Sequence, residues 1–224
     1  MGPETATRHS NVAYVLAKLR LRGEDCLLLH AHPKWGDWSL VGGHVEPTDA
    51  TWLAAAAREV EEEMAPLRYG DDVEVDPLDL PATQWGPIPS RSADLRPTSY
   101  RAEWYVLRFK TDPSELLAKL PSGEFCLVRV ADLTHAANLS SVIHRAATVL
   151  PHGWDSLPLS WQANLDQLPL EQLAITHTPH TLSERSGQGA MRAVDRRAGL
   201  RELSQLTQEL GGYDAELDFE ADLK

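Results

Sequence analysis

The segment from residue 49 to residue 64 constrains the fold more than any other part of the chain. It is built from alanine, leucine, glutamate and arginine, which favour an α-helix, and Pro66 is expected to end it. Its apolar residues recur at the spacing of one buried helical stripe: Leu53, Ala56, Ala57, Val60 and Met64. We therefore predict an amphipathic helix that lies close against a sheet.

Three glutamates share one side of this predicted helix. Each residue turns by about 100°, so Glu62 and Glu63 fall roughly 60° and 40° to either side of Glu59, whereas Glu61 lies opposite. Crowded carboxylates repel one another when they are merely exposed, but a hard divalent cation uses such oxygens as ligands. Arg58 is placed to orient Glu62 through a charge-assisted hydrogen bond. A plain solvated acidic face is the alternative, and the flanking residues help to decide.

Those flanking residues carry a recognisable signature. The helix contains REVEEE (58–63), and WSLVGG (38–43) leads into it. Together they resemble the signature of the Nudix hydrolase superfamily, G-x5-E-x7-R-E-U-x-E-E-x-G-U, where U is a bulky apolar residue and the usual lead-in is W-x-L-P-G-G. Gly43 opens the motif, and Val41 replaces the proline of the lead-in. The resemblance covers about residues 10–150.

The chain departs from the signature at both ends of the motif. Asp49 replaces the first glutamate, and the interval from it to Arg58 is one residue longer than in the pattern. Ala65 replaces the closing glycine, and Pro66 replaces the apolar residue after it. We expect either a loop or the first helical turn to absorb the insertion. Because the three glutamates keep their mutual spacing, we expect metal binding to be retained.

The resemblance implies a metal site and a hydrolytic reaction. Glu59, Glu62 and Glu63, together with the backbone carbonyl of Gly42, would hold one to three Mg²⁺ or Mn²⁺ ions. Metal-activated water would cleave a pyrophosphate bond in a nucleoside diphosphate linked to another moiety. The resemblance also implies that Arg58 is one of the catalytic residues.

Three side chains outside the helix are further candidates. Glu124 is a candidate for the general base or an additional metal ligand, with an exposed surface residue as the alternative. Trp35 is a candidate to stack on a nucleobase, with ordinary packing as the alternative. Arg101 is a candidate phosphate contact, with plain surface charge as the alternative.

The remaining sequence predicts an α/β domain over residues 1–150. The resemblance implies an α/β/α sandwich, with a mixed sheet between the helix at 50–64 and a helix at 140–150. Residues 151–224 have no counterpart in the family, and we expect a mainly helical extension with a helix near 190–210. Elsewhere we predict strands at 12–22, 26–32, 39–41, 98–110 and 125–130 and a helix at 114–120. For residues 77–97 we predict a proline-rich loop, with a short strand near Gln84 and Trp85 as the alternative.

Composition narrows the choice of partners. The formal charge of −12 argues against a nucleic-acid-binding protein, and no run approaches the roughly 18 apolar residues of a membrane span. The first ten residues contain no signal-peptide core, so we expect a cytoplasmic protein with Cys26 and Cys126 as buried free thiols. The expected partner is a nucleotide-type small molecule. For the extension, the alternatives are packing back on the domain, covering the pocket or forming a homodimer.

We therefore predict a Mg²⁺-dependent pyrophosphohydrolase. The rival is a non-catalytic nucleotide or metabolite sensor that keeps the fold, favoured by Asp49, the inserted residue and Ala65. Binding of a ligand without turnover, with metal present, would support the sensor.

Overall fold

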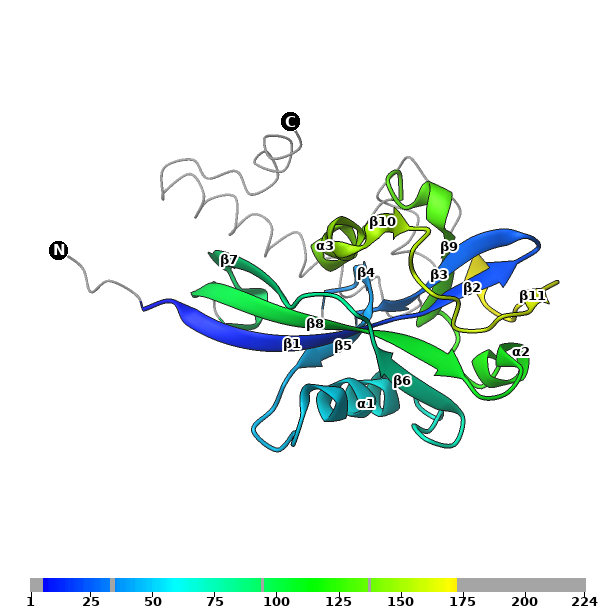
Figure 1. Cartoon of the computed structure of the whole chain (residues 1–224), viewed down its shortest axis with the longest axis horizontal. Coiled ribbons are helices and arrows are strands. Elements are labelled where there is room, and N and C mark those ends of the chain that lie inside the picture. Colours follow the sequence, from blue (N-terminus) through cyan, green and yellow to red (C-terminus); the bar gives the residue numbers. More distant parts are fainter. Residues whose placement is uncertain (1–5, 33–34, 94, 137, 173–224) are drawn as a thin grey trace. The chain divides into compact units, whose positions relative to one another are not determined.

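The computed structural model describes residues 6–32, 35–93, 95–136 and 138–172 (Figure 1). Strands in this part of the chain form two sheets. The first has the order β5-β1-β8-β6, with β7 also paired to β8. Strands β1 and β8 run parallel and the other pairs of this sheet are antiparallel, so the sheet is mixed. Its strands are β1 (Arg8–Leu16), β5 (Val41–His44), β6 (Val73–Pro77), β7 (Thr83–Pro89) and β8 (Pro97–Phe109).

The second sheet has the order β11-β2-β3-β9-β12, with β4 paired to β3. The strands predicted around residues 26–32 and 125–130 are confirmed and lie in this sheet. The expected architecture has one mixed sheet, whereas the structure has two. Its strands are β2 (Lys18–Leu21), β3 (Glu24–Ala31), β4 (Trp38–Ser39), β9 (Phe125–Arg129), β11 (Asn164–Leu165) and β12 (Glu171–Gln172). A further short strand is β10 (Pro151–Trp154).

The single strand predicted over residues 12–22 is wrong, because this segment supplies one strand to each sheet. Strand β1 ends at Leu16 and β2 begins at Lys18. Between them the carbonyl of Ala17 accepts a hydrogen bond of 2.9 Å from the amide of Leu28. Every residue from Val15 to Leu19 is buried, so no change in the apolar pattern marks the crossing. The chain crosses back to the first sheet at Leu40, between β4 and β5.

Within the loop predicted over residues 77–97, the alternative of a strand near Gln84 and Trp85 is confirmed by β7, which is longer than expected. This strand pairs antiparallel with β8, and its register shifts between Trp85 and Ile88. Pro87 and Pro89 cannot donate backbone hydrogen bonds, which is why the segment resembles a loop. Proline is tolerated on edge strands, and β7 has β8 as its only partner strand in the described structure.

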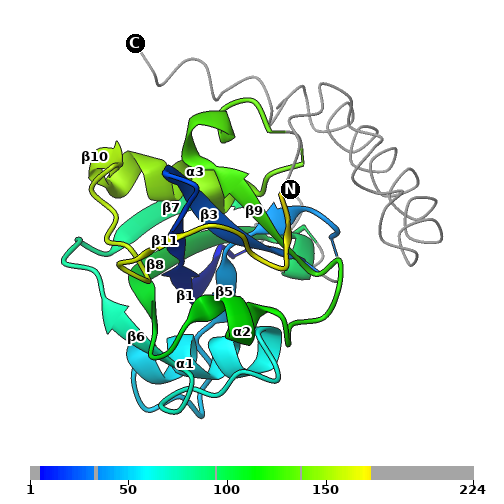
Figure 2. The ribbon, with the colours of Figure 1, turned by 90° about the vertical axis from the view of Figure 1, so that its right-hand side faces the viewer.

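Helices cover both faces of the first sheet. Figures 1 and 2 show α1 and α3 on opposite sides of β1, β5 and β8, as the predicted α/β/α sandwich requires. The α-helices are α1 (Trp52–Glu63), α2 (Pro113–Leu117) and α3 (Ser141–Val149), and two short 3₁₀ helices lie at Arg91–Ala93 and Val130–Asp132. None of the described helices has the length and apolar character needed to cross a bilayer.

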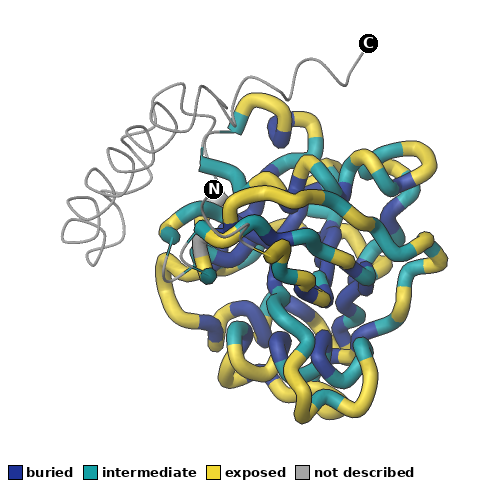
Figure 3. The backbone as a smooth tube through the Cα atoms, turned by 90° about the vertical axis from the view of Figure 1, so that its left-hand side faces the viewer, coloured by how far each residue is buried: buried dark blue, intermediate teal, exposed yellow. Residues whose placement is uncertain are grey.

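An apolar core lies beneath α1 and continues into the second sheet. Figure 3 shows the buried residues gathered in the interior and the exposed ones along the outer loops. Ala56, Val60 and Met64 are buried as predicted, and Ala55 joins them. Small alanine side chains let the helix approach the sheet closely. Glu59 is also buried, with 9 % of its surface exposed, so the first site glutamate lies at the interface between helix and sheet.

The described part of the predicted extension packs on the domain. Strand β11 pairs with β2 and β12 pairs with β9, while Leu157 and Leu165 are buried. Residues 151–172 therefore complete the second sheet as strands and loops. The boundary after residue 150 stays a prediction, and the helix expected near 190–210 lies outside the described residues.

Candidate active site

The loop before α1 absorbs the inserted residue. Thr51 caps the helix by accepting a hydrogen bond of 3.0 Å from the amide of Ala54, and α1 then runs without interruption to Glu63. Two hydrogen bonds between Glu46 and Asp49 close the preceding loop: the amide of Asp49 donates to the carbonyl of Glu46 (3.0 Å), and the amide of Glu46 donates to the Asp49 carboxylate (2.7 Å). The motif residues on α1 therefore keep ideal helical spacing.

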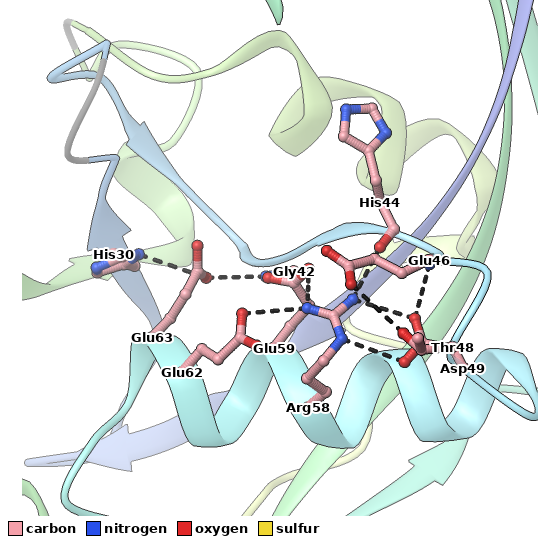
Figure 4. Close-up of polar contacts among 10 residues, drawn as sticks. All are labelled: His30, Gly42, His44, Glu46, Thr48, Asp49, Arg58, Glu59, Glu62 and Glu63. Carbon is pink, nitrogen blue, oxygen red and sulfur yellow. Dashed lines mark hydrogen bonds and ion pairs between the residues drawn. The ribbon is translucent and has the colours of Figure 1, made fainter.

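Arg58 joins this loop to the helix. Its guanidinium donates two hydrogen bonds to Asp49, of 3.2 and 3.1 Å, and one of 2.9 Å to the carbonyl of His44. It also donates to Glu59 at 3.0 Å and to Glu62 at 3.1 Å (Figure 4). The Arg58 hydrogen bonds lower the pKa of Asp49 below its usual value, and Asp49 is the main cause that raises the pKa of Arg58. Asp49 therefore anchors Arg58 despite its shorter side chain.

Glu59 lies directly over Gly43. A Cβ atom at residue 43 would lie 2.5 Å from Oε1 of Glu59, so only glycine leaves room for the carboxylate in this position. Burial raises the pKa of Glu59 to about 7, and the charge of Glu63 adds to this shift. Arg58 opposes the shift through its charge and its hydrogen bond. The helix thus holds a carboxylate that titrates near neutral pH in the absence of a cation.

Glu63 faces the other glycine of the pair. Its Oε2 accepts a hydrogen bond of 3.0 Å from the amide of Gly42 and lies 3.4 Å from Nδ1 of His30. Gly42 has a φ of +137°, and a Cβ there would lie 2.2 Å from the carbonyl oxygen of Ala13. The diglycine therefore serves two purposes: Gly42 brings β5 against β1, and Gly43 leaves space for the Glu59 carboxylate.

The donor set suits a hard divalent cation. Glu59, Glu62 and Glu63 offer only carboxylate oxygens, the ligand type that Mg²⁺ prefers. The raised pKa of Glu59 reflects first its burial and then the charge of Glu63, which the Arg58 guanidinium offsets only in part. Within the described ranges no group of three or more His, Cys, Asp or Glu side chains is arranged to enclose an ion. Glu59 and Glu62 instead face Arg58, while Glu63 faces Gly42.

Glu124 lies close to this group in the fold. It precedes β9, and its carbonyl accepts a hydrogen bond of 2.8 Å from the amide of Ala31. The next residue, Phe125, pairs with His30 across the strands, and their rings stack with centroids 4.8 Å apart. His30 is the histidine beside Glu63. The Glu124 side chain is exposed, and its role stays a prediction.

Arg101 does not lie beside the glutamates. It lies on β8, with its guanidinium 5.4 Å from the ring centre of Trp52 and 4.0 Å from Glu103. Trp52 begins α1, ten residues before Glu62, which corresponds to roughly 15 Å along the helix. Trp35 lies between β3 and β4. The substrate-binding roles of both residues stay predictions.

The sequence reasoning missed two histidines of this region. His30 contacts Glu63, and the carbonyl of His44 accepts a hydrogen bond from Arg58. His30 comes from a strand 33 positions away from its partner, so no local spacing indicates the contact. His44 directly follows the diglycine, and this position is the signal that was available.

Comparison with known proteins gives one family match. A family model described as NUDIX domain matches residues 8–152. Among solved structures, an Ap4A hydrolase from C. elegans is 19% identical, covering 55% of this chain and 83% of that one, with a TM-score of 0.39. NrtR from Shewanella oneidensis is 17% identical, with coverages of 58% and 56% and a TM-score of 0.40. A NUDIX family hydrolase from Clostridium perfringens is 19% identical, with coverages of 59% and 89% and a TM-score of 0.40. No curated protein matches the sequence.

Proposed function

This chain belongs to the NUDIX domain family, and from that premise we propose that it is a Nudix-type hydrolase that cleaves a pyrophosphate bond in a nucleoside diphosphate linked to another moiety. The proposed reaction depends on Mg²⁺ or Mn²⁺. The observation that carries this proposal is the group of three glutamates on one side of α1, of which Arg58 contacts only Glu59 and Glu62, together with the burial that raises the pKa of Glu59 to about 7. Such an arrangement is poorly balanced without a cation.

We assign the cation to Glu59, Glu62, Glu63 and the carbonyl of Gly42. When bound, the cation would neutralise charge on the diphosphate and lower the pKa of an attacking water. To provide ligands, Glu59 and Glu62 turn away from the guanidinium of Arg58, which now holds both. Arg58 stays anchored by Asp49 and the carbonyl of His44. It therefore acts as a positioning residue for the carboxylates.

The remaining roles follow from position. We propose Glu124 as the general base, because its exposed carboxylate directly precedes Phe125 of β9, which pairs with His30 of β3. We propose Trp35 as a surface for a nucleobase, because aromatic faces stack on any base. The phosphate contact proposed for Arg101 would need a substrate that extends along α1 to Trp52.

A hydrolysis assay on a nucleotide panel tests this function. Wild type and Glu62→Gln are compared with Mg²⁺, with Mn²⁺ and with chelator, and Glu61→Gln is the matched control, since Glu61 is an exposed glutamate of the same helix. We expect Glu62→Gln to lose at least roughly a hundredfold in kcat/KM, as for an interaction made mainly in the transition state. Glu61→Gln should stay within about twofold, because a solvated glutamate makes no such contact. Equal activity of wild type and Glu62→Gln would exclude the mechanism.

The non-catalytic sensor remains a second candidate function. The observation in its favour is that Arg58 engages Asp49, Glu59 and Glu62 together, which stabilises the site without a cation. Calorimetric binding of a nucleotide with metal present, combined with no cleavage of any panel compound, would support the sensor. Cleavage that depends on Glu62 would exclude it.

A further inference from the structure

The face of the first sheet opposite α1 carries polar and aromatic side chains that the glutamate site does not use. Side chains alternate along a strand, so Arg8, Ser10 and Tyr14 of β1 share this face. Their neighbours across the pairing with β8 include Tyr100 beside Ser10 and Trp104 beside Tyr14. Tyr14 and Trp104 stack with ring centroids 5.5 Å apart.

Helix α3 covers one end of this face and contributes one arginine side chain to it. Ala146, Val149 and Leu150 of the helix share an apolar pocket with Leu16 and Trp104. This packing fixes the position of α3 on the sheet. The remaining part of the face, toward Ser10 and Tyr100, lies beyond this apolar contact.

Arg145 of α3 is this arginine. Its guanidinium lies 5.0 Å from the ring centre of Trp85, and Trp85 stacks on Tyr100 at 5.3 Å. The Nε atom of Arg145 is buried without a hydrogen-bond partner. Within the described part of the chain no carboxylate forms an ion pair with Arg145. A guanidinium stacked on an aromatic ring keeps its edge available for a planar anion, and an unpaired buried donor is costly.

A second arginine on the same face has the same property. Nη1 of Arg8 is buried without a partner, and it and Nε of Arg145 are the two such side-chain atoms in the described ranges. Arg8 lies on β1 two residues before Ser10, whose Oγ is 2.7 Å from Nδ1 of His44. Two unpaired guanidinium groups on one sheet face are unusual in a chain with a formal charge of −12.

Hydrogen bonds connect this face to the catalytic helix. The hydroxyl of Tyr100 donates to Ser90 at 2.7 Å, and Ser90 and Ser92 share a hydrogen bond of 3.1 Å. Ser92 lies 3.4 Å from Nε2 of His44, whose carbonyl accepts from Arg58. Figure 4 shows the His44 ring directed away from α1 and its carbonyl directed toward Arg58. His44 therefore links the two sides of the sheet.

Tyr14 connects the same two regions. It pairs with Gly42, whose amide bonds Glu63. Burial is the main cause that raises the pKa of Tyr14, the site glutamates add to it, and Arg145 opposes it. Tyr14 therefore lies beside the strand that carries the site glycines and, through its stack on Trp104, belongs to the face opposite α1.

We propose that Arg145, held against Trp85, binds a phosphate group of the ligand on the face of the first sheet opposite α1. This inference rests on the proposed function for the identity of the ligand. Because the two phosphates of the nucleoside diphosphate flank the scissile bond, the phosphate bound here belongs to the linked moiety. A phosphate accepts two parallel hydrogen bonds from a guanidinium. The phosphate comes either from a nucleotide or from free inorganic pyrophosphate.

Titration calorimetry with the full chain tests the proposal. The probes are ADP, adenosine and inorganic pyrophosphate, each measured in chelator at low ionic strength so that neither cleavage nor metal contributes. The variants are Arg145→Gln and Arg145→Lys, with Arg108→Gln as control because Arg108 is a β8 arginine paired with Asp76 at 2.8 Å. Thermal midpoints of all variants verify folding.

We expect Arg145→Gln to weaken ADP binding at least about tenfold, as for loss of a charged hydrogen-bond partner. Adenosine binding and the Arg108→Gln variant should stay within about twofold. Arg145→Lys should retain part of the affinity, because it keeps the charge but not the planar fork. An equal loss for pyrophosphate indicates a subsite for free phosphate, and a loss for ADP alone indicates one for a nucleotide; both support the proposal.

Three results would overturn it: unchanged ADP affinity in Arg145→Gln, an equal loss for adenosine, or no binding of ADP and pyrophosphate by wild type. If Arg145→Gln does not fold, the Arg145→Lys variant provides the test. If Arg145→Lys binds ADP and pyrophosphate with the affinity of wild type, the proposal is overturned. Absence of hydrolysis with intact, Arg145-dependent ADP binding would refute the proposed function alone. Intact hydrolysis with ADP affinity independent of Arg145 would refute this inference alone.

Discussion

Asp49 and Arg58 are nine positions apart, and two hydrogen bonds of 3.2 and 3.1 Å join the carboxylate to the guanidinium. The pair closes the loop before α1 onto the helix that carries the site glutamates. The loop has one residue more than the family motif, and Asp49 has one methylene fewer than the glutamate it replaces. Asp49 nevertheless accepts two hydrogen bonds from Arg58. The departures from the family motif at this end therefore preserve the anchoring of Arg58.

Asp49→Asn should weaken metal binding by roughly ten- to a hundredfold, the usual effect of removing a group that orients metal ligands. Without the carboxylate, Arg58 has one anchor fewer and is drawn further toward Glu59 and Glu62. Mn²⁺ affinity by electron paramagnetic resonance measures this effect. Asp71→Asn, an exposed aspartate in the turn before β6, should behave as wild type. Equal Mn²⁺ affinity of Asp49→Asn and wild type would contradict the anchoring role.

Stability in the absence of divalent cations should fall as the pH rises from about 4.5 to about 7. The pKa of Glu59 rises on folding from 4.5 to about 7, so the folded state binds more protons in this window and loses that advantage as the carboxylate ionises. After allowance for solvent screening, the effect is on the order of 1 kcal/mol. Urea unfolding at several pH values, in wild type and Glu59→Gln, measures it. An identical pH slope in both proteins would count against Glu59 as the source, and Glu61→Gln should keep the wild-type slope.

The two glycines of the pair should respond differently to alanine. Gly42→Ala forces a Cβ against the backbone of β1 at a positive φ, so we expect a loss of at least about 2 kcal/mol in the free energy of unfolding. Gly43→Ala meets only the movable carboxylate of Glu59, and it should fold normally but bind metal weakly. Gly70 has a φ of +85° and open space around it. Gly70→Ala therefore measures the loss of stability caused by a positive φ alone, without a steric contact. Denaturant unfolding and Mn²⁺ titration of the three variants separate these effects, and equal stability of Gly42→Ala and Gly70→Ala would show that the contact with β1 is unimportant.

Magnesium should stabilise the folded protein at pH 7.5. A ligand that binds only the folded state at a hundred times its Kd adds about 2.7 kcal/mol to the free energy of unfolding. The rise in thermal midpoint should disappear in Glu59→Gln and in Glu62→Gln and persist in Glu61→Gln. A shift that survives in all three variants would place the ion elsewhere.

The site helix could be predicted from the sequence because its information is local. Pro66, the alanines and the spacing of the glutamates lie within about twenty residues, and α1 follows this pattern closely. The burial of Glu59 was not predictable in the same way. It depends on the approach of α1 to Gly43, and helical spacing does not specify that distance.

The other differences between the predicted and the observed structure arise from contacts between residues far apart in the sequence. The crossing at Ala17 lies inside a run of residues that are all buried, so the apolar pattern does not change where the sheet changes. Strand β7 resembles a loop because of its prolines and is a strand because β8 offers it an edge. The contact of Arg145 with Trp85 joins positions sixty residues apart. The cytoplasmic location, the homodimer and the role of residues 173–224 stay predictions.

The parallel pairing of β1 with β8 sets an order on folding during synthesis. Arg8 pairs with Thr98 and Leu16 with Val106, each ninety positions further along the chain. A nascent chain that ends before residue 97 has β5 as the only neighbour of β1 within the first sheet, and the edge of β1 that faces β8 is unpaired. Contacts between such distant residues form slowly. The acidic helix therefore leaves the ribosome well before the central strand of its sheet, and the complete site forms only after that strand has been translated.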